Sequence, residues 1–256
     1  MGIPWDAGTY DQSSQPQQAW ASEVLARLDR IAGDGTILDV GCGTGRVTEL
    51  LLELVPHGRV LAVDASDEMV ALARARLGDR AEVWCQDALD IELDEPVDVV
   101  VSTAALHWVP DHDRLWARLA QTLRPGGVLE VQCGGQGNID RVRQVIDAVS
   151  RDRAPKLVGW SPWVFASPQE TEQRLIAAGF TAIRCWLEER PTYPENVAAF
   201  VSTSILAAHL ARLPEEQREP FAGAVVAGVS LPLDYVRLNI SAVLGTREPG
   251  IAASTR

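Results

Sequence analysis

Short apolar runs alternate with helical patterns through the first 150 residues of this chain. This rhythm is typical of a parallel sheet with helices on both faces, because each crossover between parallel strands needs a connection long enough for a helix. The alternation therefore predicts the α/β class. The predicted strands are 36–40, 59–63, 81–85, 97–102 and 128–133, and the predicted helices are 17–31, 46–55, 67–77, 114–123 and 139–150.

The rhythm breaks after residue 150. Residues 151–166 contain Pro155 and Pro162 with tryptophans nearby, which predicts a loop or lid. A helical stretch at 195–228 also interrupts the strand pattern. We expect one domain over residues 1–256, in which these two segments cap the substrate.

Two more strands flank the second cap segment. A helix that ends at Gly179 leads into a predicted strand at 180–187. Residues 235–241 alternate apolar and polar side chains, as a half-buried strand does. We expect these two strands to lie side by side, with the helices of the cap inserted between them in the chain.

Residues 37–45, Ile-Leu-Asp-Val-Gly-Cys-Gly-Thr-Gly, predict a strand that runs into a glycine loop and opens a helix, where backbone amides can approach a ligand. A dinucleotide fingerprint would need glycine at the position of Arg46. Asp39 at the mouth of the loop would repel a pyrophosphate but attract an ammonium or sulfonium. The loop therefore predicts a positively charged ligand, and S-adenosylmethionine carries two such groups in its methionine half.

Carboxylates at the next two strand ends indicate a nucleoside. Asp64 ends the second strand, nineteen residues past Gly45, where an acceptor can take both ribose hydroxyls. The third strand ends in Cys85-Gln86-Asp87-Ala88, and Asp87 can offer its carboxylate to an adenine amino group.

This combination resembles the class I S-adenosylmethionine-dependent methyltransferases, in particular the trans-aconitate 2-methyltransferase group, over residues 5 to about 245. The family implies a seven-stranded Rossmann-like sheet in the order 3-2-1-4-5-7-6, with the last strand antiparallel, and an N-terminal aromatic segment that closes over the cofactor. The matching segments are Asp39 to Gly45, Asp64, Asp87 with Ala88, Leu123 to Gly127, Leu106 to Val109, and Trp5 with Tyr10. The predicted cofactor-binding residues are Trp5, Tyr10, Asp39, Gly41, Cys42, Gly43, Gly45, Asp64, Ala65, Met69, Gln86, Asp87, Ala88, Ser102, Thr103 and His107.

His107 is the candidate catalytic residue. It is placed where a general base could face the transferred methyl group, although a histidine after a strand is often structural. If the acceptor is a carboxylate, the group is already ionised at neutral pH, and the histidine would only orient it. The other histidines, His57, His112 and His209, are predicted at the surface.

Aromatic side chains are the candidates for the acceptor pocket, with a role in the core as the alternative. Trp108 and Trp116 follow helical spacing and are expected to lie partly in the core. The seven candidate arginines for a tricarboxylate such as trans-aconitate, Arg141, Arg143, Arg151, Arg153, Arg174, Arg190 and Arg237, cannot be placed on one surface from sequence. The tryptophans favour a less charged, aromatic or aliphatic acceptor, methylated on oxygen. The predicted substrate-binding residues are Trp108, Trp160, Trp163 and Phe165.

Composition narrows the alternatives. The net charge of −12 disfavours nucleic acid, and the fourth strand lacks the Asn/Asp-Pro-Pro-aromatic motif of amino-group enzymes. Four widely spaced cysteines, expected mostly in strands, indicate neither a metal site nor a disulfide framework. With no predicted membrane span or leader, we expect a cytoplasmic enzyme. Two rival hypotheses are an S-adenosylmethionine-binding enzyme that catalyses cyclisation, rearrangement or decarboxylation, and a non-catalytic binding protein. The oligomeric state is left open.

Overall fold

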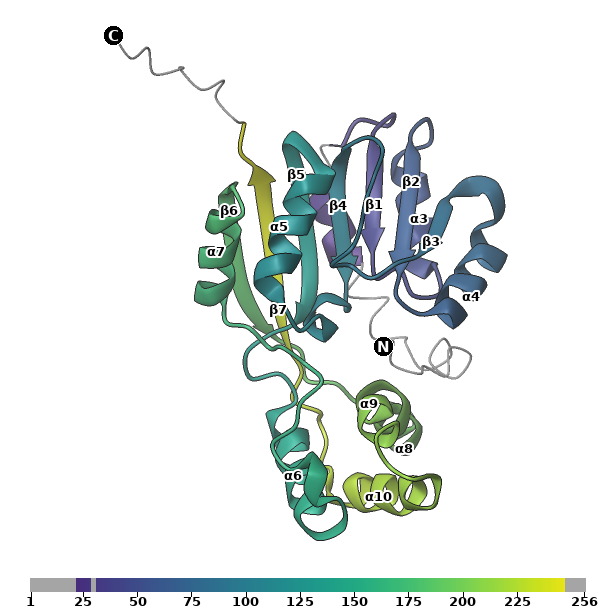
Figure 1. The fold of residues 1–256 in the computed structure, drawn as a ribbon, viewed down its shortest axis with the longest axis vertical. Coiled ribbons are helices and arrows are strands. Elements are labelled where there is room, and N and C mark those ends of the chain that lie inside the picture. Colours follow the sequence, from purple (N-terminus) through teal and green to yellow (C-terminus); the bar gives the residue numbers. More distant parts are fainter. Residues whose placement is uncertain (1–21, 29–30, 247–256) are drawn as a thin grey trace.

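The computed structural model describes residues 22–28 and 31–246. Seven strands form one sheet in the order β3-β2-β1-β4-β5-β7-β6 (Figure 1). Parallel pairing joins the strands from β3 to β5, and β7 runs antiparallel to both β5 and β6. The expected strand order is confirmed. The strands are β1 (Thr36–Val40), β2 (Arg59–Asp64), β3 (Glu82–Cys85), β4 (Val97–Thr103), β5 (Leu123–Gly134), β6 (Phe180–Glu189) and β7 (Val236–Leu244).

Helices cover both faces of this sheet. Consecutive residues of the parallel strands are apolar, and because successive side chains point to opposite faces, both faces are apolar and need to be covered. Leu38 of β1 packs in a core cluster with side chains of α5 and α7, whereas its neighbour Ile37 packs with α3 on the opposite face. The helices are α3 (Arg46–Leu54), α4 (Asp67–Leu77), α5 (His112–Thr122), α6 (Asp140–Arg153), α7 (Pro168–Ala177), α8 (Val197–Phe200), α9 (Ala207–Leu210) and α10 (Glu215–Gly228). Short helices are η1 (Ala26–Leu28), η2 (Gly78–Arg80), η3 (Leu106–Trp108), η4 (Pro155–Leu157) and the π-helix η5 (Val201–Ile205).

Four helices, α6, α8, α9 and α10, form a separate layer beyond the carboxyl ends of the parallel strands (Figure 1). This cap has its own apolar cluster, in which Ile146 of α6 packs with Phe200 and Phe221. The helical stretch predicted at 195–228 is divided, because α8 passes into η5 and α10 begins only after Pro214. As expected, it lies between β6 and β7 in the chain, and these two strands pair.

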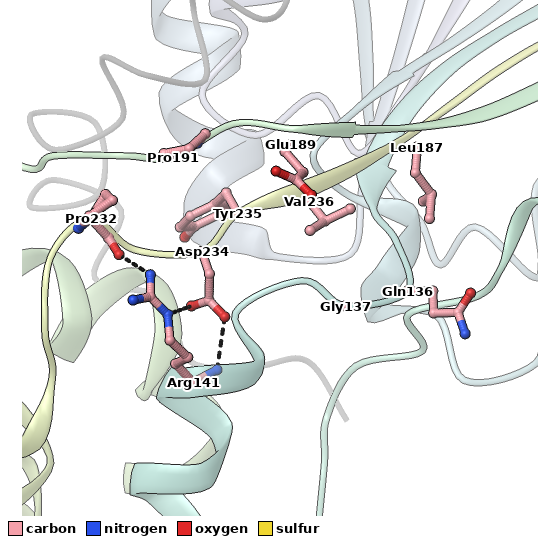
Figure 2. A pocket seen from close by; sticks show the side chains of 10 residues that line it. All are labelled: Gln136, Gly137, Arg141, Leu187, Glu189, Pro191, Pro232, Asp234, Tyr235 and Val236. Atoms are coloured by element: carbon pink, nitrogen blue, oxygen red, sulfur yellow. Dashed lines mark hydrogen bonds and ion pairs between the residues drawn. The ribbon is translucent and has the colours of Figure 1, made fainter.

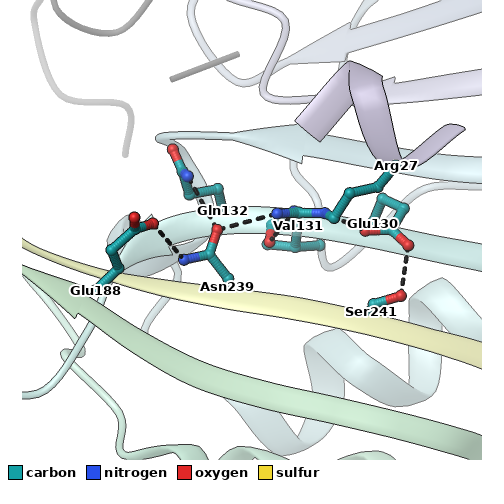
Figure 3. Close-up of polar contacts among 7 residues, drawn as sticks. All are labelled: Arg27, Glu130, Val131, Gln132, Glu188, Asn239 and Ser241. Carbon is teal, nitrogen blue, oxygen red and sulfur yellow. Dashed lines mark hydrogen bonds and ion pairs between the residues drawn. The ribbon is translucent and has the colours of Figure 1, made fainter. Parts of the chain in front are cut away.

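The expectation of a half-buried last strand is wrong for its polar side chains. Arg237 and Asn239 of β7 are 2% and 1% exposed. The polar side of β7 meets a polar layer on β5, in which Gln132 Nε2 donates to Asn239 Oδ1 at 2.9 Å (Figure 3). Arg27 of η1 joins this layer, since its Nε lies 2.7 Å from Glu130 Oε2. Polar alternation in β7 therefore marks a buried hydrogen-bond network and not a solvent face.

Two predicted surface histidines are also buried. His112 is 4% exposed and His209 is 1% exposed, whereas His57 is exposed as expected. Nε2 of His112 lies 3.1 Å from the carbonyl oxygen of Leu106, and the His209 ring packs within the cap. Both rings are amphipathic and fill space in an otherwise apolar layer, which residue type alone did not indicate.

Smaller corrections concern β5 and the cysteines. β5 begins at Leu123 and not at residue 128, because Leu123 pairs with Val97 before the register shifts. Most cysteines were expected to be buried in strands, and two of them are not. Cys42 is buried but lies in the glycine loop, and Cys85 ends β3 but is exposed. All four cysteines are free. The expectation that Trp116 belongs to the core is confirmed.

Candidate active site

The glycine loop follows the carboxyl end of β1. The carboxyl ends of β2, β3 and β4 lie at the same end of the sheet, because these strands are parallel. Its three glycines have φ angles of 74°, 54° and 81° at Gly41, Gly43 and Gly45. A Cβ at Gly41 would lie 2.2 Å from Cβ of Ala105, and a Cβ at Gly45 would lie 3.0 Å from Leu77. In the part of the chain that the structure describes, no atom beyond the two neighbouring residues lies within 4 Å of a Cβ built at Gly43. Gly41 and Gly45 therefore serve packing, whereas Gly43 presents its backbone to open space.

Asp39 is 1% exposed at the base of this loop. Its Oδ2 accepts a hydrogen bond from Thr48 Oγ1 at 2.7 Å, and its Oδ1 has no hydrogen-bond partner among the described residues. Burial raises the pKa of Asp39 to about 7, with the charge of Asp64 adding to this and the Thr48 bond opposing it. A buried carboxylate oxygen without a donor is costly, and a cationic ligand would satisfy it. This arrangement fits the ammonium end of methionine.

Asp64 is held rigidly at the end of β2. Its Oδ2 accepts from the Gly43 N–H and its Oδ1 accepts from the Ser66 N–H, both at 2.9 Å. Burial raises the pKa of Asp64, and these backbone bonds oppose the shift. Each carboxylate oxygen has a second lone pair, so the oriented group can still accept from ribose hydroxyls.

The structure places the remaining predicted cofactor residues on this edge with different burial. Asp87 is exposed after β3, and its Oδ1 accepts from the Leu89 N–H at 3.0 Å. Ser102 is buried and its Oγ donates to the Val40 carbonyl at 2.7 Å, which ties the ends of β4 and β1 together. Burial raises the pKa of the Cys42 thiol well above its usual value, so this side chain packs as a neutral thiol. Met69 is buried, Ala65 is exposed, Gln86, Ala88 and Thr103 are half-buried, and Trp5 and Tyr10 lie outside the described residues.

His107 is buried in η3, just after β4. The backbone N–H of Gly134 donates to its Nδ1 at 3.2 Å. Burial lowers the pKa of His107 well below its ordinary value, and the charges of Arg237 and His112 lower it further. The ring is therefore neutral, and because Nδ1 accepts, its proton lies on Nε2. In this tautomer Nε2 is a hydrogen-bond donor.

Three of the four predicted acceptor-site aromatics gather around His107. The Phe165 ring lies 5.7 Å from the His107 ring and stacks on Trp163 at 5.6 Å, and Trp108 lies 5.6 Å from Trp163. The Val164 N–H donates to the carbonyl of His107 at 2.8 Å, which anchors the segment. Trp160 joins this group through His209, whose ring lies 4.9 Å from the Trp160 ring and 5.3 Å from the Trp163 ring. The guanidinium of Arg212 lies 4.2 Å from the Trp160 ring.

Several residues that shape the site were not predicted from the sequence. Thr48 holds Asp39, and Ala105 lies against Gly41. Ala104 has a φ of 58°, a rare conformation for alanine, and its N–H donates to the Gln132 carbonyl at 2.7 Å. Gly134 fixes His107 from the neighbouring strand. These contacts join segments far apart in sequence, so only the fold reveals them.

A cavity of about 600 Å³ lies between the end of the sheet and the cap (Figure 2). At one side of it, Asp234 accepts a hydrogen bond from the Arg141 N–H at 2.8 Å and so caps the start of α6. The cavity is also lined by Gln136, Gly137, Leu187 and Glu189, and its lining does not include the glycine loop. Among the described residues, no group of three or more His, Cys, Asp or Glu side chains is arranged to hold a metal ion. Within the same residues, no helix has the length and apolar character that crossing a bilayer requires.

Comparison with known proteins identifies the family. Residues 37–127 match a family described as a methyltransferase domain. The trans-aconitate 2-methyltransferase of Methylobacterium nodulans is 38% identical over 183 residues, which span 72% of this chain and 67% of that protein. The chain belongs to the class I S-adenosylmethionine-dependent methyltransferases. Its cofactor is S-adenosylmethionine, as the carboxylates at the sheet edge indicate.

Other relatives of this methyltransferase match over shorter stretches. The malonyl-acyl-carrier-protein O-methyltransferase of Bacillus anthracis is 34% identical over 51% of this chain and 50% of that protein. The trans-aconitate 2-methyltransferase of Variovorax paradoxus is 36% identical, and the match again spans 50% of its length. This methyltransferase thus aligns with about half the length of these two curated relatives.

Solved structures share the fold at low identity. A phosphoethanolamine N-methyltransferase 2 of Haemonchus contortus has a TM-score of 0.64 at 18% identity, covering 94% of this methyltransferase and 57% of that chain. The cyclase SpnF has a TM-score of 0.61 at 21% identity, covering 90% of this chain and 82% of that one. These similarities show the fold and do not identify the methyl acceptor.

Proposed function

We propose that this methyltransferase transfers the methyl group of S-adenosylmethionine to an oxygen atom of a small molecule, and that the accepting group is a carboxylate. The observation that carries the proposal is the hydrogen bond from Gly134 to Nδ1 of His107. It leaves a neutral donor where a phenol or alcohol acceptor would need a base. Two relatives are named for the methylation of trans-aconitate and of malonyl-acyl-carrier protein, both of which carry carboxylates.

A carboxylate acceptor needs no proton transfer, because it is ionised at neutral pH. S-adenosylmethionine supplies a methyl carbon that is electrophilic because its sulfur is positively charged. The acceptor oxygen forms the new bond to this carbon, and the electron pair of the carbon–sulfur bond stays on sulfur, so S-adenosylhomocysteine leaves. His107 keeps its proton on Nε2 and orients the acceptor. Alignment of this kind supplies much of the rate in an in-line displacement.

The chain's own residues hold the cofactor in this proposal. Asp39 attracts the methionine ammonium, Gly43 allows close approach of the backbone, and Asp64 accepts from the ribose hydroxyls. Asp87 accepts from the adenine amino group. None of these roles requires a metal.

We further propose that residues 1–256 act as one domain in which segments 151–166 and 195–228 cap the acceptor and exclude water. Trp163 and Phe165 connect the first segment to His107. The net charge of −12 and the four free cysteines support a small acceptor in a cytoplasmic setting over nucleic acid.

The test is incubation of the purified chain with S-adenosylmethionine and matched carboxylic acids, phenols and amines. S-adenosylhomocysteine is followed by mass spectrometry, and cofactor binding by calorimetry. We expect turnover with at least one carboxylic acid and methyl ester as the product. Turnover only with phenols or amines contradicts the carboxylate assignment. Cofactor binding with a converted substrate but no S-adenosylhomocysteine would instead support a non-methylating reaction on the same fold.

A further inference from the structure

The cavity of Figure 2 lies where the chain crosses between the sheet and the cap. Most of its lining comes from three connections: 136–137 between β5 and α6, 189–191 between β6 and α8, and 232–236 between α10 and β7. Its volume of about 600 Å³ is within the range of sites for small molecules. A ligand in this cavity would therefore contact three of the segments that join the cap to the sheet.

The charges that line the cavity are not balanced. The guanidinium of Arg141 lies beside Asp234, with Nε 3.7 Å from Oδ1, and it also donates to the Pro232 carbonyl. Glu189, the last residue of β6, is exposed, and its carboxylate has no hydrogen bond or ion pair with any residue that the structure describes. Because Arg141 and Asp234 offset each other, the net charge of the lining is that of Glu189.

Apolar side chains accompany Glu189 in the lining. Leu187 precedes it by two residues on β6, so both side chains lie on the same face of the sheet, and Leu187 is 37% exposed. Pro191, Pro232 and Val236 line the cavity as well. A carboxylate among apolar groups suits an organic ammonium, whose charge is attracted while its carbon chain covers the apolar surface. An anion would be repelled, and a bare metal ion would need further ligands, which no group of His, Cys, Asp or Glu in the described ranges provides.

The wall of the cavity also contacts the segment that holds His107. A Cβ at Gly135 would lie 2.6 Å from Cδ2 of Leu187, so Leu187 packs directly against the backbone there. The Gly135 N–H donates to the Val236 carbonyl at 3.0 Å. Gly134, the preceding residue, donates to Nδ1 of His107. Two residues of the lining therefore contact the neighbour of the residue that orients the His107 ring.

The cap begins at the same cavity. The Arg141 N–H, in the first turn of α6, donates to Asp234 at 2.8 Å. The Gln136 N–H donates to the carbonyl of Ala166 at 3.0 Å, and Ala166 follows Phe165 in the chain. The lining is thus bonded both to the start of α6 and to the segment that carries the acceptor-site aromatic rings.

We propose that this cavity is a regulatory site for an organic ammonium, with Glu189 as its counter-ion and Leu187 and Val236 against its carbon chain. This ligand is distinct from the methyl acceptor, because the lining includes neither the glycine loop nor His107. By contacting three connections at once, it holds the cap against the sheet. Binding in the cavity is independent of the proposed methyl transfer, whereas its effect on the acceptor rests on that function.

The test compares two amines, hexylamine and benzylamine, with the neutral alcohols of the same carbon skeleton, 1-hexanol and benzyl alcohol. Saturating S-adenosylhomocysteine keeps the amines away from Asp39, and binding is measured by ligand-observed NMR and calorimetry at low salt. In the wild type we expect at least one amine to bind about fivefold more tightly than its alcohol, the scale of an exposed ion pair. Glu189→Gln is expected to abolish this preference. Glu172→Gln, an exposed glutamate of α7 changed in the same way, should keep it.

Hydrogen exchange tests the contact with the three connections. In the wild type with the preferred amine, we expect slower exchange in peptides that cover 134–140, 189–196 and 229–236. In Glu189→Gln the same concentration of amine should leave the exchange of these peptides unchanged.

The outcomes separate this site from the proposed function. If neither amine is preferred over its alcohol, or if Glu189→Gln keeps the preference, the cavity site is overturned and the methyltransferase assignment stands. If the preference depends on Glu189 but the amine does not slow exchange in the wild type, the regulatory role is overturned and the binding site stands. Failure of the wild type to bind S-adenosylhomocysteine would count against the assignment and not against the cavity.

Discussion

The backbone N–H of Gly134 donates to Nδ1 of His107 across 3.2 Å and so determines which ring nitrogen carries the proton. β5 and η3 meet at this contact, and the strand controls the chemistry of a residue 27 positions earlier in the chain. A histidine held in this way can position an acceptor but cannot take a proton from it, because its one lone pair is already engaged.

Two substitutions of His107 should distinguish the role of Nδ1 from the role of Nε2. In His107→Asn the amide oxygen can take the place of Nδ1 and accept from Gly134, whereas in His107→Gln the amide nitrogen reaches the position of Nε2. We expect His107→Asn to retain more stability and His107→Gln to retain more activity. Each loss is about 1 to 3 kcal/mol, the cost of an unmade buried hydrogen bond.

Thermal unfolding and kcat/KM with any acceptor that turns over check this prediction. The kcat/KM profile of the wild type should also show no limb from a histidine between pH 5 and 8, since the pKa of His107 lies well below its usual value. If the wild-type profile shows a titration between pH 5 and 8 that is absent in His107→Gln, His107 acts as a general base and the prediction is wrong.

Cofactor affinity should depend on pH through Asp39. Its pKa of about 7 means that the attractive, ionised form is a minority at pH 6 and dominant at pH 8. Below pH 7 we expect the affinity for S-adenosylmethionine to fall by up to about tenfold per pH unit. Asp39→Asn should bind about 10- to 100-fold more weakly and lose this dependence. Calorimetry at pH 6, 7 and 8 measures both, and an identical pH profile in the variant would contradict the role of Asp39.

The same group should act on stability with the opposite sign. The pKa of Asp39 rises from 3.8 to about 7 on folding, so its contribution to stability is fully present below pH 3.8 and is lost as the pH rises through 7. Without cofactor, Asp39→Asn is therefore expected to melt at a higher temperature than the wild type at pH 8, with the difference closing at pH 4 to 5. A lower melting temperature for the variant at pH 8 would show that the buried charge is compensated.

Substitutions in the glycine loop should separate packing from binding. Gly41→Ala places Cβ 2.2 Å from Ala105 and is expected to destabilise the fold strongly. The Cβ of Gly43→Ala would meet no atom of another described residue within 4 Å, its two chain neighbours aside. The substitution should therefore cost only about 1 to 2 kcal/mol of backbone strain yet weaken cofactor binding by about tenfold or more. Gly126→Ala, with a φ of 80° and equally open surroundings, is the matched control for strain. Equal cofactor affinity in Gly43→Ala and Gly126→Ala would refute the close approach at Gly43.

The polar layer of Figure 3 should show strong coupling between Arg27 and Glu130. Glu130 is buried, and its carboxylate binds Arg27 at 2.7 Å and Ser241 at 2.5 Å. Arg27→Met leaves this charge without its cation and is expected to cost about 3 to 5 kcal/mol. Adding Glu130→Gln should recover part of the loss. A double-mutant cycle by urea unfolding measures the coupling, and additive effects would mean that the pair contributes nothing to stability.

Local sequence patterns predicted most of the strands, and they predicted that the candidate cofactor-binding residues follow the carboxyl ends of these strands. Strands β1 to β4 begin and end within about two residues of their predicted limits, because apolar runs and turn residues act over short distances. Asp39, Gly43 and Asp64 share one edge since parallel strands end together. The polar side of β7 was misjudged because period-two alternation does not say whether the polar side faces water or another polar strand.

The sequence by itself determined the fold class, the strand order through its family resemblance, and the cofactor, because these depend on short segments whose residues are neighbours in the chain. Only the tertiary structure decided the hydrogen bonds and buried charges around His107. The proton of His107 is fixed by Gly134, and one arginine among seven, Arg237, is placed beside them by a strand that pairs across more than a hundred residues. Hydrogen bonds and buried charges of this kind act through space, and no spacing along the chain encodes them.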